Sequence, residues 1–147
     1  MQSEVLTGMI TRSSGALVKA TTELGEKALW NPMGKGRNAV DQCVECGFLS
    51  TLIAESLKTQ SSPPFDREKM VALKAENDTP EKALALLNSG TDELLAAIAA
   101  FPAENWGVTM TLPWGENSFA DLVRFVYWNN TYHEGQINYI QTLAEGA

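Results

Sequence analysis

The chain has 147 residues, of which 44% are hydrophobic and 20% are charged, and its formal net charge is −7 at pH 7. This length fits one domain over residues 1–147, which is large enough to bury a core without disulfide bonds. The acidic balance argues against non-specific binding to nucleic acid or to an anionic membrane surface. No apolar run approaches the roughly 18 residues that a membrane span needs, and no signal-peptide pattern is present. We therefore expect a cytoplasmic protein.

The spacing of apolar residues predicts a first helix over residues 3–24, with Ser3 as its N-cap. Gly8 and Gly15 lie inside this helix and lower its propensity, but their missing side chains would allow a neighbouring helix to approach closely. A connection punctuated by Pro and Gly follows at residues 28–37.

A second helix is predicted from Asn38 to Lys58, with an apolar surface rich in Leu and Phe. Pro63 and Pro64 then exclude a continuous helix, and residues 66–76 are expected to form a short one. This segment is too short to separate two cores. We interpret it as an excursion between two helices of the same domain.

The next helix begins with the start signal Asp78-Thr79-Pro80-Glu81, since Pro is favoured in the first turn and an acidic side chain suits the helix N-terminus. It is expected to run to Phe101, with Gly90 as a local weak point or kink. The following residues 106–116 alternate briefly, which predicts an extended stretch or a small hairpin.

The last helix is expected to start at Asn117 or Ser118 and to end near Ala144. Four long amphipathic helices must then share one core, so the sequence predicts an all-α, up-down bundle with at least one longer crossing. One stripe of the last helix mixes apolar and polar residues: Leu122, Phe125, Val126, Asn129, His133, Gln136, Ile137 and Ile140. Buried polar side chains need partners or a ligand, which makes this stripe the most informative feature of the chain.

Asn129 and His133, the only histidine, are four positions apart and share one face of the helix. This is the spacing at which a helix offers two ligands to one metal ion. Glu45, at the buried edge of the second helix, is the best candidate for a third ligand, and Gln136 could join the site. The alternative interpretation is a hydrogen-bonded polar cluster that satisfies a neutral histidine without any metal.

Cys43 and Cys46 are too few for a zinc site and are spaced poorly for a disulfide within a helix. We interpret them as small buried hydrophobic residues. The alternative, a nucleophilic thiolate beside His133, requires an exposed and activated cysteine. Trp114 and Trp128 are expected near the mouth of the bundle, as packing residues or as a ligand-binding rim.

The last helix is preceded by Pro113-Trp114-Gly115-Glu116 and contains Tyr132-His133-Glu134-Gly135-Gln136-Ile137-Asn138-Tyr139-Ile140. This run resembles the end of the DinB-like (YfiT-like) metalloenzymes, whose last helix carries a His-x-x-x-His-x-Gly-Gln-Ile pattern. Here the pattern keeps His133, Gly135, Gln136 and Ile137, and Asn129 stands in place of the first His.

The resemblance implies an antiparallel four-helix bundle with a down-up-up-down course, and a homodimer. It also implies a divalent metal, nickel or zinc, held by one histidine of the second helix and two of the last. The corresponding positions are Glu45, Asn129 and His133, so only His133 keeps the residue of the family.

Because two of the three ligand positions are changed, we expect weak or no metal affinity in a pocket that the fold retains. On this hypothesis the protein is non-catalytic, and its pocket is a remnant or binds a small molecule. The alternative is a metal-dependent hydrolase or thiol-dependent transferase that uses Glu45, Asn129 and His133, with His133 as a ligand or general base. A third hypothesis, partner binding through the aromatic mouth, rests on the tryptophans alone.

Overall fold

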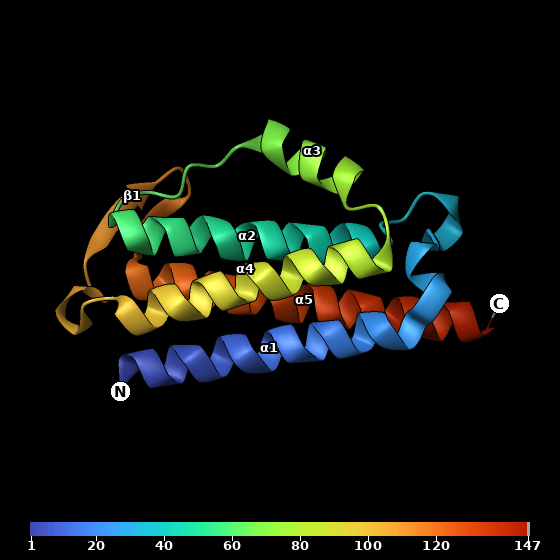
Figure 1. The fold of residues 1–147 in the computed structure, drawn as a ribbon, viewed down its shortest axis with the longest axis horizontal. Coiled ribbons are helices and arrows are strands. Elements are labelled where there is room, and N and C mark those ends of the chain that lie inside the picture. Colours follow the sequence, from blue (N-terminus) through green and yellow to red (C-terminus); the bar gives the residue numbers. More distant parts are fainter. Residues whose placement is uncertain (147) are drawn as a thin grey trace.

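The structure, a computed structural model, describes residues 1–146 and is mostly helical, with a small two-stranded sheet (Figure 1). The α-helices are α1 (Gln2–Leu24), α2 (Ala39–Thr59), α3 (Arg67–Glu76), α4 (Pro80–Ala100) and α5 (Phe119–Gly146). The strands are β1 (Thr109–Leu112) and β2 (Gly115–Ser118), and short 3₁₀ turns occupy Gly25–Leu29, Pro32–Gly34 and Ala103–Asn105. The all-α prediction is therefore confirmed at the level of a helical protein with a short extended segment before its last helix.

The four long helices lie side by side, with α1 and α5 running in one direction and α2 and α4 in the other (Figure 1). Helix α2 packs on α4 and α5, and α1 packs on α5 and α4. Because α2 and α4 run the same way, the chain must return along the molecule between them. The segment that contains α3 makes this return outside α2, where the sequence predicted an excursion.

Apolar side chains from all four long helices fill the interior in two clusters. Ile53, Ile98 and Val126 belong to the cluster nearer the hairpin. Leu17, Leu87 and Ile137 belong to the other. The buried part of the predicted α5 stripe consists of Leu122, Val126, Asn129, His133, Ile137 and Ile140.

Side-chain caps define most of the helix starts. Asn38, Asp66 and Thr79 each accept a hydrogen bond from the backbone N–H three residues later. At α5 it is Ser118, and not Asn117, that accepts from the N–H of Asp121, whose carboxylate accepts the Ser118 N–H in return.

Several helix limits differ from the sequence prediction by one or two residues. Helix α1 begins at Gln2, with Met1 at its N-cap, so Ser3 lies within the first turn and does not cap it. Helix α5 continues past Ala144 to Gly146.

Before the start of α5, residues 109–118 form an antiparallel hairpin in which Leu112 pairs with Gly115, so the hairpin alternative is confirmed.

Helices α2 and α4 touch at two glycines. A Cβ placed on Gly47 would lie 2.9 Å from the Leu86 carbonyl oxygen, and a Cβ on Gly90 would collide with the carbonyl oxygen of Gly47. Gly90 is therefore a point of close backbone approach between α2 and α4. The prediction for Gly8 and Gly15 was wrong, because both face open space and no helix approaches them.

Among the described residues, only α4 is long and apolar enough to cross a membrane by length and composition. This is weak evidence for a span, because core helices of soluble proteins pass the same test. The buried residues of α4, including Leu87, Leu94 and Ile98, pack in the two interior clusters.

We predict that Gly90→Ala lowers the free energy of unfolding by about 1–3 kcal/mol, because the new methyl group overpacks the contact with α2. Gly15→Ala is the matched control within a helix, and it should be neutral or stabilising by up to about 1 kcal/mol. Urea unfolding followed by circular dichroism measures both. Equal effects of the two substitutions would contradict the close approach at Gly90.

Candidate functional site

His133 forms the centre of a polar site between α2 and α5. Its side chain is 3% exposed, and its Nε2 lies 2.6 Å from Oε2 of Glu45 on α2. The histidine is therefore held against a carboxylate in the interior, as its place on the buried stripe of α5 required.

The other ring nitrogen also has protein partners. Nδ1 of His133 lies 2.7 Å from Oε1 of Gln42 and 3.0 Å from Oε1 of Gln136. Gln42 is 2% exposed and precedes Glu45 by one turn of α2, so the same helix contacts both sides of the ring. Each nitrogen of His133 is thus engaged within the protein.

An arginine neutralises the carboxylate at this site. Nη1 of Arg37, just before α2, lies 3.2 Å from Oε2 of Glu45, the same oxygen that contacts His133. Nε of Arg37 donates to Asp41, which is also 2.9 Å from Nζ of Lys74 on α3. A chain of alternating charges therefore links α3 to the buried histidine through α2.

This environment stabilises the charged form of Glu45. The hydrogen bond from His133 and the positive charge of Arg37 lower the pKa of Glu45 from 4.5 to about 2, against the opposing effect of burial. The carboxylate stays ionised throughout the physiological pH range.

Asn129 lies one turn before His133 and is 8% exposed. Its Nδ2 is 3.5 Å from Sγ of Cys46, a weak contact, and it makes no hydrogen bond with Glu45 or His133 within the described residues. The three predicted site residues are therefore brought to one region, but only Glu45 and His133 are in direct contact.

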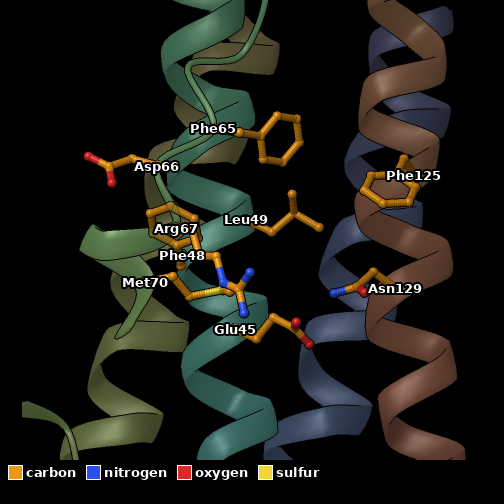
Figure 2. A pocket seen from close by; sticks show the side chains of 9 residues that line it. All are labelled: Glu45, Phe48, Leu49, Phe65, Asp66, Arg67, Met70, Phe125 and Asn129. Carbon is orange, nitrogen blue, oxygen red and sulfur yellow. The ribbon is translucent and has the colours of Figure 1, made fainter. Parts of the chain in front are cut away.

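Glu45 and Asn129 border a cavity of about 230 Å³ between α2, α5 and the segment that leads into α3. Figure 2 shows their side chains approaching from the two helices, with Phe65 and Phe125 further along the cavity. The lining residues are Glu45, Phe48, Leu49, Phe65, Asp66, Arg67, Met70, Phe125 and Asn129. Most of this surface is apolar, so the cavity can enclose a small molecule.

A series of aromatic rings borders the cavity and continues along the surface of α5. Phe65 meets Trp114 edge to face at 5.4 Å, and Trp114 lies 6.5 Å from Phe125. The stack continues from Phe125 through Trp128 to Tyr132, at 5.8 and 5.4 Å between ring centres. The tryptophans expected at the mouth are thus packed against residues that line the cavity.

The residues present do not fit a nickel or zinc ion. Among residues 1–146, no three His, Cys, Asp or Glu side chains are grouped so that they could hold a metal. The aligned positions Glu45, Asn129 and His133 offer one carboxylate, one amide and one imidazole, and an amide is a poor ligand for these metals. The Glu45 oxygen nearest His133 already accepts from His133 and Arg37.

The two cysteines are enclosed by other side chains. Sγ of Cys43 is 3.1 Å from the Thr21 hydroxyl, and burial raises the pKa of Cys43 to about 11. Burial also raises the pKa of Cys46 well above its ordinary value. Neither thiol has the exposed, activated form that a nucleophile requires.

The model of the DinB superfamily matches residues 14–137, which include α2, α3, α4 and the predicted site residues. The chain belongs to the DinB superfamily. It has no match among curated proteins or among solved structures. Membership confirms the resemblance seen in the last helix, and for this DinB protein it identifies no substrate or reaction.

Two residues of the site in this DinB protein, Arg37 and Gln42, were not predicted from the sequence. Gln42 precedes Glu45 by three positions, so helical spacing alone could have placed it on the same face. Arg37 lies in the connection before α2, where periodicity gives no direction for a side chain. Its contact with Glu45 depends on how that connection folds back on the helix.

We predict that Glu45→Gln lowers the free energy of unfolding at pH 7 by about 1–2 kcal/mol, because it removes a paired charge. The pKa of Glu45 is lowered in the folded state, so its stabilising effect is present above pH 4.5 and is lost as the pH falls toward 2. The difference in the free energy of unfolding between wild type and Glu45→Gln should therefore become smaller as the pH falls from 4.5 toward 2.

Urea unfolding at pH 7, 5, 4 and 3 measures this difference. Glu55→Gln is the matched control, since Glu55 is an exposed carboxylate of the same helix. A difference between wild type and Glu45→Gln that stays constant from pH 7 to pH 3 would contradict the role of the paired carboxylate.

Both thiols should be inert in the folded protein. We expect Ellman's reagent to release no product at pH 8 under native conditions, and to react with both cysteines after denaturation. Rapid reaction of one cysteine in the native state would revive the nucleophile hypothesis, and Cys43→Ser and Cys46→Ser would identify which thiol reacts.

Proposed function

We propose that this DinB protein retains the pocket of its family as a small-molecule binding site and has weak or no affinity for a metal ion. We further infer that its four long helices form the antiparallel, down-up-up-down bundle of the DinB/YfiT-like proteins. On this proposal the protein catalyses no metal-dependent reaction.

One observation carries this proposal: the Glu45 oxygen that faces His133 also accepts from Arg37. A divalent cation at this point would have to displace His133 or the guanidinium and would lie beside a fixed positive charge. Coulomb repulsion from Arg37 is strongest where the site is shielded from water. The arginine thus supplies the positive charge that the carboxylate needs.

The second candidate is a metal-dependent hydrolase or thiol-dependent transferase that uses Glu45, Asn129 and His133. It is favoured by the shared cavity of Glu45 and Asn129 and by the direct contact of Glu45 with His133. It requires rearrangement of Arg37 and of the ring contacts before His133 can act as a ligand or a base.

A homodimer in the cytoplasm remains part of the proposal. The resemblance to the DinB-like family supports it, as do the exposed rings of Trp128, Tyr132 and Tyr139 on α5, which are 56%, 51% and 64% exposed. Light scattering of the purified protein measures the assembly state.

We predict that tag-free protein incubated with nickel or zinc and then dialysed retains clearly less than one metal ion per chain. The variant Glu45→His/Asn129→His restores three histidines at the aligned positions and removes the partner of Arg37. It should retain more metal than the wild type, because imidazole is the better ligand for both ions. Metal content by mass spectrometry is the readout.

Glu45→Ala and His133→Ala are the controls for a native site. One metal ion per chain in the wild type, lost in both of these variants, would overturn the proposal and favour the metal-dependent enzyme.

A further inference from the structure

We propose that the cavity bordered by Glu45 and Asn129 binds a small, single-ring or similarly compact apolar molecule through an uncharged, hydrogen-bond-donating head group, a hydroxyl. This inference deepens the proposed function and rests on it, because the ligand occupies the metal-free pocket. It specifies the chemistry of the ligand at both ends.

The size and walls of the cavity set the body of the ligand. A protein cavity of about 150 Å³ lined by apolar side chains encloses benzene, and this cavity measures about 230 Å³. There is room for one ring with a short substituent. Phe48, Phe65 and Phe125, together with Leu49 and Met70, line the cavity with apolar surface from three segments of the chain.

The polar end of the cavity sets the head group. Oε2 of Glu45 is occupied by His133 and Arg37, but Oε1 accepts no hydrogen bond from residues 1–146. The Asn129 side chain approaches it from α5 (Figure 2), with its nitrogen toward Cys46. Oε1 of Glu45 is therefore free to accept, and a ligand with an O–H group would satisfy it.

Arg67 raises the opposite possibility, an anionic ligand. Its side chain extends over the cavity from the start of α3 (Figure 2), and it makes no ion pair within residues 1–146. Arg67 is exposed, however, whereas the Glu45 side chain is only 25% exposed. Because charge interactions weaken with contact to water, the carboxylate should select the ligand more strongly than the guanidinium.

Four probes that share a benzene ring and differ in head group test which head group the cavity selects. Benzylamine, benzyl alcohol, toluene and benzoate are titrated into the full-length protein, and amide chemical shifts follow binding. We expect benzyl alcohol to bind about tenfold or more tightly than toluene, because a hydrogen bond to a charged group adds at least that factor. It should also bind more tightly than benzylamine, whose ammonium group is repelled by Arg37. Benzoate should bind most weakly.

Two substitutions locate the selection. Glu45→Gln should reduce the preference for benzyl alcohol over toluene by about tenfold. Asn129→Leu, which leaves the Glu45 pairs intact, should weaken benzyl alcohol and strengthen toluene. Glu55→Gln is the control, because Glu55 lies on the same helix and lines only a neighbouring hollow.

Three results would overturn the inference. These are equal affinity for all four probes, no binding of any probe, and a preference for benzoate that Arg67→Gln abolishes. Metal content measured on the same preparations separates this test from that of the proposed function. One metal ion per chain would contradict the proposed function. Metal-free protein that does not bind the probes selectively would contradict only the assignment of the ligand.

Discussion

The contact between His133 and Glu45 is the interaction on which the site depends. It joins α5 to α2 across the interior, and it is charge-assisted because the carboxylate remains ionised. A buried carboxylate facing a histidine alone would be costly, and Arg37 removes much of that cost by approaching the same oxygen. The two glutamines on the far side of the ring complete the set of partners.

That arrangement explains why a DinB protein with changed ligand positions can remain well packed. In a metal site, the ion joins the ligand side chains of two helices. Here a hydrogen bond between His133 and Glu45, supported by Arg37, connects α2 and α5. The adjacent cavity is walled mostly by apolar residues of α2, α5, α3 and the segment before α3.

The close packing of α2 against α4 supports the site from behind. Gly47 lies one turn after Cys43 and two residues after Glu45, and its contact with Gly90 fixes the position of α2. Cys43 and Cys46 are buried in the interior, where Cys43 contacts Thr21 of α1 and Cys46 contacts Asn129 of α5. Their raised pKa values follow from that burial, so the thiols contribute packing and no reactivity to the site.

The sequence by itself determined the helices, the start signal at Asp78-Thr79-Pro80-Glu81, the hairpin as one of two alternatives, and the place of His133 on a buried stripe. These follow from local chemistry, namely apolar period, capping side chains and the turn at Pro113-Trp114. Only the tertiary structure decided which glycines contact a neighbouring helix, and which side chains contact His133 and Glu45. Arg37 reaches the site from the loop before α2, and Gln42 reaches it from the turn of α2 before Glu45. Arg67 reaches it from a separate helix, α3. Such contacts depend on distances between segments, and local periodicity carries no information about those distances.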